Sequence, residues 1–551
     1  MEQKTKNNFM VQGAILGISS IVVRLIGVVY RIPLTNIIGD KGIGYYSVAF
    51  DIYSILLLLS SYSMPLAVSK MVSSRVAVGE VKNTRKILLC ALALALLLGI
   101  CAFSITFFLS DIFASQVMQV PQSAVALRVL SFALIILSIL GVIRGYFQGL
   151  GNMIPTALSN IIEQIFNAVI SVVAAGSLYE YGKTIVSGSY DYSNLPEAFG
   201  AAGGTLGTVC GALAAMIFLI IVLFLHGKKN RYLFDEDETV KTESLKIIIK
   251  VLILTIVPVI LNTAIYNLSS VVDKFIFSNI ATANGMDADL KDSLIGMFSG
   301  KYWLIVNIPI ALASALASSL IPSIVSSVSR GEVRSVIEKV RSAIRITLLV
   351  SLPCAAGIAA LAEPIVMFLF PSSEDPEKVA LMLITGCLTV VFYCISTISN
   401  SILQGIDKMR IPVIHSAVSL AINALVLCVL MAVFNMDVFA WIIADMVFAL
   451  SMCIMNALSL KKYLGYKQEI KKTFLLPGAA AVIMGAAAYY FNILVNKFIH
   501  HSWNVIISII VAVVIYGILL LLFRAVDSDV LRTVPGGTRL CVILKKMHLL
   551  K

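Results

Sequence analysis

The sequence predicts an all-α integral membrane protein in which 14 transmembrane helices form two six-helix lobes related by a parallel repeat, plus two C-terminal helices. Three observations predict this class. Hydrophobic residues make up 59% of the 551 residues and charged residues only 13%, against about 25% charged residues in an average soluble domain. Apolar stretches follow one another along the chain, and short motifs of the first half recur in the second. These observations exclude a water-soluble fold.

Each expected helix is an apolar stretch bounded by charged or turn-forming residues. A hydrocarbon core of about 30 Å takes about 20 apolar residues per helix. By this criterion the spans lie at 10–33, 43–66, 86–109, 123–146, 154–176, 200–225, 251–280, 294–322, 344–370, 380–402, 411–433, 438–460, 474–496 and 503–523. The first span follows a short basic tail with Lys4 and Lys6 and has no small-residue cleavage site. We therefore expect a span there and not a removable signal peptide.

The distribution of Lys and Arg predicts the orientation of the chain. If the N-terminus is cytoplasmic, 32 of the 42 basic residues lie in cytoplasmic segments, and the outer loops carry acids such as Asp111, Asp191, Asp289 and Glu374. An excess of Lys and Arg in cytoplasmic loops is the usual rule. Both termini are therefore expected in the cytoplasm. The net charge of +12 is explained by topology and anionic lipid headgroups, so it does not indicate a nucleic-acid partner.

Internal repeats divide the chain into lobes. Gly44-Tyr45-Tyr46-Ser47 recurs as Gly296-Met297-Phe298-Ser299, Gly79-Glu80-Val81 as Gly331-Glu332-Val333, and Gln148-Gly149 as Gln404-Gly405, at offsets of 252, 252 and 256. We expect an N-terminal lobe at 1–227, a cytoplasmic linker at 228–247, a C-terminal lobe at 248–460, two further helices at 461–524 and a cytoplasmic tail at 525–551. Six helices per lobe make the repeat parallel, which predicts a transport site between the lobes.

The sequence shows no sign of catalytic or metal chemistry. The nine cysteines fall singly and without a CxxC pair, so neither a disulfide framework nor a zinc site is indicated. No nucleotide-binding motif and no hydrolase signature stands out. We therefore expect a protein that is not an enzyme, without catalytic residues, metal or cofactor.

Several stretches carry a family resemblance. The stretch GIGYYSVAFDIYSILLLLSSYSMPLAVSKMVS at 42–73 is the most specific, supported by RLIGVVYRIPL in the first span and by QGLGNMIP and QGIDKMRIP before the fifth and eleventh spans. With these motifs the chain resembles the multidrug/oligosaccharidyl-lipid/polysaccharide (MOP) flippase superfamily, in the group of stage V sporulation protein B and the MurJ-type lipid II flippases. The resemblance implies a bacterial plasma-membrane protein that moves an undecaprenyl-pyrophosphate-linked saccharide outward through a central cavity.

Charged residues inside the spans are the candidate substrate site. An ionisable group at the bilayer centre costs about 3 kcal/mol on insertion scales, so such residues usually face a cavity or a partner. At about 1.5 Å per helical residue, Arg24, Asp51 and Lys301 share one depth. Lys274 is the repeat counterpart of Arg24, and Asp273 lies beside it. We expect Arg24, Lys274 and Lys301 to bind the pyrophosphate, balanced by Asp51 and Asp273; the alternative is a set of internal ion pairs.

Other polar residues inside the spans suggest coupling or packing. Glu163 and Asp445 are acids deep in helices, without a clear partner by sequence, and are candidates for binding a proton or sodium ion. Asn167 lies one turn after Glu163, and its repeat counterpart is Asn423. Both asparagines either line the cavity or join helices by hydrogen bonds. His415 is more typical of a packing residue than of a proton switch.

Alternating access driven by the membrane potential is the expected mechanism, with coupling to a proton or sodium ion left open. The expected partners are a lipid-linked oligosaccharide, membrane lipids and cell-wall synthases. Three other functions remain open: a cation-coupled exporter of drugs or amphiphiles, a membrane scaffold for cell-wall synthesis, and an enzyme acting on lipid-linked sugars. An exporter would have an acid-dominated cavity, a scaffold has no use for buried charges, and an enzyme needs larger outer loops.

Overall fold

The structure, a computed structural model, describes residues 2–186, 194–229, 243–466, 468–498 and 503–523. All regular elements within these ranges are helical. The chain forms two compact units, unit 1 (Met1–Gly300) and unit 2 (Lys301–Lys551). Most of the expected linker at 228–247 and the whole expected tail at 525–551 lie outside the described residues. The lobe boundaries expected from the repeat remain predictions.

Within the described ranges, twelve helical segments are long and apolar enough to cross a membrane. One of them, Ile15–Val76, is 62 residues long and covers most of the expected span 10–33 and all of the span 43–66. The helical run breaks at Gly39, whose φ is 70°, between the first and second expected spans. A further helix, Leu245–Ala283, covers the span expected at 251–280. The multi-span helical class is confirmed, and the count of 14 stays a prediction.

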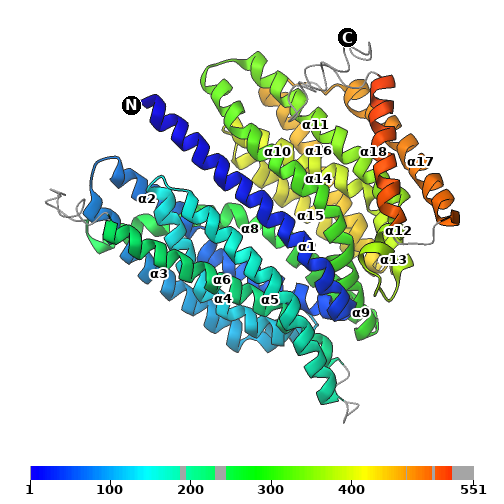
Figure 1. The fold of residues 1–551 in the computed structure, drawn as a ribbon, viewed down its shortest axis with the longest axis horizontal. Helices are drawn as coiled ribbons and strands as arrows, with labels where there is room; N and C mark the ends of the chain where they lie inside the picture. Colours follow the sequence, from blue (N-terminus) through cyan, green and yellow to red (C-terminus); the bar gives the residue numbers. More distant parts are fainter. Residues whose placement is uncertain (1, 187–193, 230–242, 467, 499–502, 524–551) are drawn as a thin grey trace. The chain divides into compact units, whose positions relative to one another are not determined.

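In unit 1 the helices form a layered bundle (Figure 1). Its elements are α1 (Glu2–Leu57), α2 (Met64–Val76), α3 (Val81–Phe108), α4 (Ser123–Gly149), α5 (Ile154–Val186), α6 (Leu195–Lys229), α8 (Leu245–Ala283) and α9 (Ala288–Gly296). Helix α4 packs against α2, α3 and α6, while α5 lies along α6 and α1. Small residues permit close approach: a Cβ on Gly207 of α6 would lie 2.6 Å from the Ser171 nitrogen of α5. Such small-residue contacts are typical of helix pairs in membranes.

Unit 2 is built around α14. Its helices are α10 (Trp303–Ser329), α11 (Val333–Ala360), α12 (Ala362–Leu369), α13 (Pro376–Thr385), α14 (Cys387–Gly405), α15 (Arg410–Ala432), α16 (Val438–Leu464), α17 (Leu476–Phe498) and α18 (Asn504–Leu522). Helix α14 packs against α10, α11 and α16. The C-terminal pair joins this bundle through contacts of α17 with α11. The expected spans at 344–370 and 380–402 are each divided into two helices, and the span at 294–322 is divided among α9, the π-helical turn Met297–Tyr302 and α10.

The packing of unit 2 repeats that of unit 1. Contacts of α4 with α2, α3 and α6 correspond to contacts of α14 with α10, α11 and α16, and the pair α5–α6 corresponds to α15–α16. The connecting turns repeat as well. Gly79 and Gly331 have φ values of 81° and 70°, and Gly151 and Asp407, 256 positions apart, have 78° and 60°. These recurrences support the internal repeat that the sequence motifs indicate.

Candidate functional site

A buried ion pair joins α1 and α8 in unit 1. Lys274 Nζ lies 2.6 Å from Asp51 Oδ2, and the two side chains are 6% and 15% exposed. Asp273, the neighbour of Lys274, is fully buried. The structure thus brings together two of the expected site residues, Asp51 and Lys274, as an ion pair. Removing one partner of a buried pair leaves an uncompensated charge, which costs about 3–5 kcal/mol.

Arg24 and Arg31 both lie on α1. The side chain of Arg24 is exposed, and within the described residues no hydrogen bond or ion pair joins it to Asp51 or Lys274. Arg31 lies two helical turns further along and interacts electrostatically with Tyr30, Tyr46 and Asp51. Arg31 is therefore a neighbour of the ion pair that the sequence reasoning missed. The sequence contained one signal for this position: Arg31 lies seven residues after Arg24, and this spacing keeps both side chains near one face of a helix.

Lys301 lies in a π-helical turn, Met297–Tyr302, ahead of α10. Its ammonium donates a hydrogen bond to Ser373 Oγ at 2.6 Å and lies 5.9 Å from the centre of the Phe370 ring. The side chain is buried. Wide helical turns of this kind are frequent at functional sites. The expected grouping of Lys301 with Arg24 and Lys274 stays a prediction.

Glu163 has a partner, contrary to the expectation from sequence. Arg144 Nη2 lies 2.7 Å from Glu163 Oε2, and Arg144 Nε donates to Ser159 Oγ at 2.9 Å. The arginine lies in the last turns of α4 and reaches Ser159 and Glu163, which are one turn apart on α5 and so share one face. The pair holds α4 against α5 and occupies one oxygen of the carboxylate.

Asp445 of α16 is a buried carboxylate with a hydroxyl partner. Tyr393 of α14 donates a hydrogen bond to Asp445 Oδ1 at 3.2 Å. In the part of the chain that the structure describes, no basic side chain lies within ion-pair distance of Asp445. The ring of Tyr393 packs against Trp303 and Phe448. Among the described residues, Asp445 is therefore held by a hydroxyl and not by an ion pair.

The two expected asparagines lie on repeat-related helices. Asn167 Oδ1 accepts a hydrogen bond from Ser171 Oγ at 2.9 Å on α5, and Asn423 on α15 is fully buried. Another buried amide forms the larger network: Asn456 Oδ1 lies 2.8 Å from His415 Nδ1, and Asn456 Nδ2 donates to Asn400 Oδ1 at 2.8 Å. His415 therefore joins helices by hydrogen bonds, as the packing interpretation predicts.

A close crossing of α1 and α9 lies at the end of unit 1 that carries the 109–122 and 284–287 connections. A Cβ on Gly44 would lie 2.4 Å from Asp292 O, and a Cβ on Gly296 would lie 1.7 Å from Asp40 O. Only glycine permits this approach of the two backbones. The two glycines occupy equivalent positions in the repeated motif. The crossing of Gly44 and Gly296 is called the glycine crossing below.

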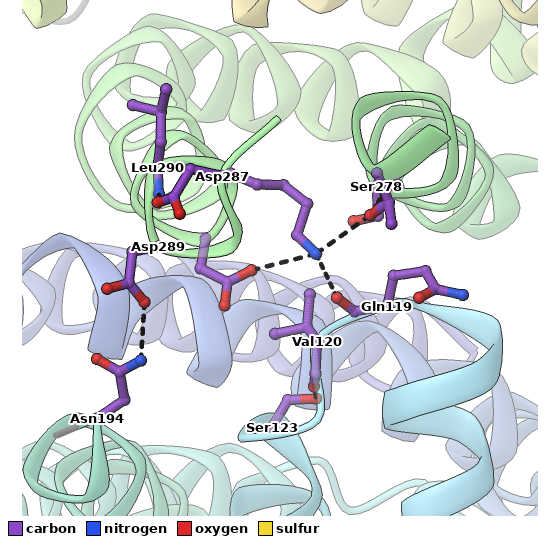
Figure 2. Close-up of polar contacts among 11 residues, drawn as sticks. Gln119, Val120, Ser123, Asn194, Ser278, Asp287, Asp289 and Leu290 are labelled. Carbon is purple, nitrogen blue, oxygen red and sulfur yellow. Dashed lines mark hydrogen bonds and ion pairs between the residues drawn. The ribbon is translucent and has the colours of Figure 1, made fainter. Parts of the chain in front are cut away.

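Polar contacts surround the glycine crossing (Figure 2). Lys41 Nζ lies 2.8 Å from Asp289 Oδ2, and Asn194 Nδ2 donates to Asp289 Oδ1 at 2.8 Å. Buried Lys291 donates to the Gln119 carbonyl, and its ammonium lies 3.7 Å from Asp292 Oδ1. These contacts tie α9 to α1 and to the starts of α4 and α6. Of these contacts, the Lys41–Asp289 ion pair joins α9 to α1.

Comparison with solved structures defines the class of protein. The inward closed conformation of the lipid II flippase MurJ matches with a TM-score of 0.65 at 16% identity, over 92% of this chain and 98% of that chain. An inward-facing multidrug resistance MATE family transporter of the MOP superfamily matches with a TM-score of 0.61 at 17% identity, over 80% and 96%. The chain is therefore a multi-pass membrane protein with the fold of these transporters.

Sequence comparison defines the family. The chain belongs to the polysaccharide biosynthesis protein family, whose model matches residues 10–328, and the MatE family model matches residues 300–430. The lipid II flippase MurJ of Bacillus subtilis (strain 168) is 24% identical over 91% of each chain. Stage V sporulation protein B of the same organism is 27% identical over 39% of each chain. The resemblance to MOP flippases inferred from the motifs is confirmed.

Proposed function

We propose that this protein is a flippase that moves an undecaprenyl-pyrophosphate-linked saccharide, such as lipid II, from the inner to the outer leaflet by alternating access. The observation that carries the proposal is the buried Lys274–Asp51 pair in a chain that aligns with a lipid II flippase over 91% of its length. A charged, hydroxyl-rich headgroup cannot enter hydrocarbon unaided. Buried basic groups between membrane helices supply the contacts that it needs.

The ion pair offers a mechanism for binding and release. In the absence of cargo, Asp51 neutralises Lys274, and Arg31 interacts with the same carboxylate. A pyrophosphate displaces the carboxylate because it offers more negative charge and more acceptors, and an arginine grips it through two parallel bonds. Arg24 is exposed on α1. A charge inside a span needs a cavity or a partner, so we place Arg24 at the cavity, as the first basic group that the pyrophosphate meets. Release returns Lys274 to Asp51.

Orientation gives the glycine crossing its role. With both termini in the cytoplasm, as the Lys and Arg distribution favours, the crossing lies at the outer face of the membrane. Its contacts close the outward path and have to part for release.

The energy comes from the membrane potential, worth about 2.3 kcal/mol per charge per 100 mV. Asp445 is the better candidate for proton coupling, because Glu163 is paired with Arg144. The protein performs no covalent chemistry on its cargo.

The main alternative function is the export of drugs, which is favoured by the match of the MatE family model to residues 300–430. The two functions differ in cargo, so one assay separates them. Purified protein in proteoliposomes is tested with fluorescent lipid II, read by the accessibility of the headgroup to a membrane-impermeant quencher, and in parallel with ethidium. We expect flipping of lipid II above the rate of empty liposomes and no ethidium transport. Ethidium transport without lipid II flipping would overturn the proposal.

A further inference from the structure

Unit 2 contains a cavity of about 730 Å³ between the α11–α12 corner and the C-terminal pair α17–α18. This volume is within the range of about 300–1,000 Å³ that is typical of small-ligand sites. Its polar lining consists of Glu363, Tyr489, Asn492, Asn496 and Asn504. The small side chains of Ala359, Ala360 and Ala362 leave the space open on the opposite side. No residue of the cavity belongs to the charged sites described above.

Two of the three asparagines of the cavity are buried, and all three are held in place by hydrogen bonds. Asn492 and Asn504 are 5% and 3% exposed, whereas Asn496 is exposed. Ser508 Oγ donates to Asn492 Oδ1 at 3.1 Å, and Asn504 Nδ2 donates to Asn496 Oδ1 at 2.9 Å. The two carbonyl oxygens are therefore occupied within the helix pair. The NH₂ donors of Asn492 and Asn496 are not used in these bonds and belong to residues that line the cavity.

The charge of the lining selects the chemistry of the ligand. Among the described residues that line the cavity, one is a carboxylate, Glu363, and none is Lys, Arg or His. A phosphate or another anion would be repelled. Amide donors, a carboxylate acceptor and the half-exposed ring of Tyr489 suit a neutral, hydroxyl-rich molecule, whose hydroxyls need both donors and acceptors. An aromatic ring also covers the apolar C–H face of a sugar.

We propose that this cavity binds a saccharide, through Asn492, Asn496 and Glu363 at its hydroxyls and Tyr489 on its apolar face. With both termini in the cytoplasm, the cavity lies at the outer face of the membrane. There it receives the sugar headgroup of the translocated lipid. The identity of the natural ligand rests on the proposed function, whereas the binding chemistry does not.

Trp503 provides a reporter at the edge of the cavity. It precedes Asn504 directly, and its ring packs against Phe368, the neighbour of the lining residue Met367. The full-length protein in nanodiscs is titrated with the disaccharide N,N′-diacetylchitobiose while tryptophan fluorescence is followed. The variant Trp503→Phe identifies the part of the signal that comes from the cavity, and isothermal titration calorimetry measures the binding without a reporter.

We expect saturable binding that weakens at least tenfold in Asn492→Leu and in Tyr489→Leu. The matched control is Tyr490→Leu, next along α17 but outside the lining, and it should bind as the wild type does. Thermal unfolding of each variant shows that the fold is kept. Absence of saturable binding to the wild type, equal affinity in all variants, or displacement by a free fatty acid would overturn the proposal. The last result would mean that the cavity holds a lipid chain.

The binding assay and the flipping assay test different proposals, so a negative result in one does not decide the other. Disaccharide binding without lipid II flipping leaves the saccharide site standing and contradicts the proposed function. Flipping of lipid II without disaccharide binding contradicts the saccharide site alone.

Discussion

Asp51 is the residue on which the charge balance of unit 1 depends. Its carboxylate pairs with Lys274 at 2.6 Å and also contributes to the electrostatic surroundings of Arg31. Asp51 and Lys274 could be predicted from the sequence, because charged residues inside apolar stretches are rare. The place of Arg31 and the pairing of Arg144 with Glu163 could not be predicted. Which charges meet depends on helix rotation and on packing between helices, and neither can be read from one apolar stretch.

Removing Lys274 alone should destabilise the protein. Lys274→Ala leaves Asp51 buried without its main partner, and we expect a loss of about 3–5 kcal/mol. The double variant Asp51→Ala/Lys274→Ala should recover most of this loss, because neither charge then remains. The measurement is chemical unfolding of the purified protein in detergent. Additive losses in the double variant would show that the two residues do not form a pair.

Asp445 should be needed for coupling and not for stability. Asp445→Asn is isosteric and keeps an oxygen for the Tyr393 hydroxyl, which now lies 3.2 Å from the carboxylate. We expect it to flip lipid II at the basal rate but to lose the acceleration that a pH gradient gives the wild type. The control is Glu163→Gln, because Glu163 is already paired with Arg144. An unchanged response of Asp445→Asn to the gradient contradicts the coupling role.

At the scale of elements, the apolar pattern predicts where helices lie better than where they break. The spans at 123–146, 411–433 and 438–460 correspond closely to α4, α15 and α16. The break at Gly39 lies between the expected spans 10–33 and 43–66, whereas the break after Gly296 was not predicted, because a break inside an apolar stretch leaves its hydropathy unchanged. Recurrent motifs were more informative. The Gly-Glu-Val motif forms the same turn twice, with glycine at positive φ both times.

The glycine crossing should not tolerate a side chain. Gly296→Ala places a Cβ 1.7 Å from Asp40 O, so α9 has to move away from α1. In a background without the nine cysteines, we expect the pair Lys41→Cys/Asp289→Cys to be linked less efficiently by a short bifunctional thiol reagent when Gly296→Ala is present. Gly517→Ala is the matched control, since no atom lies within 4 Å of its added Cβ. Equal cross-linking in both would show that the crossing tolerates a methyl group.

At the scale of the whole molecule, sequence and structure agree on a multi-pass helical protein with an internal repeat. The helix–helix contacts of α4 in unit 1 recur in those of α14 in unit 2. This recurrence explains why motifs only a few residues long could reveal the repeat. The sequence could not identify the cavity beside α17 and α18. Its asparagines come from two helices outside the repeat and from no recognisable motif, so only their meeting in space makes them a group.

The membrane potential should accelerate outward flipping. An inside-negative potential favours outward movement of an anion, and a dianionic headgroup gains on the order of 4–5 kcal/mol per 100 mV. We expect faster flipping in proteoliposomes with a valinomycin-imposed potassium gradient of this sign, and slower flipping with the opposite gradient. The control is a gradient without valinomycin. Equal rates under both signs contradict the potential as the energy source.

The central claim is that a pyrophosphate displaces Asp51 from Lys274. The direct measurement is the affinity of undecaprenyl pyrophosphate for the purified wild-type protein and for Asp51→Asn and Lys274→Met. Asp51→Asn should bind more tightly, because the competing carboxylate is gone, and Lys274→Met should bind more weakly, because the cation is gone. Effects of opposite sign on the two members of one ion pair support the account. Equal affinities, or weaker binding in both variants, would contradict it.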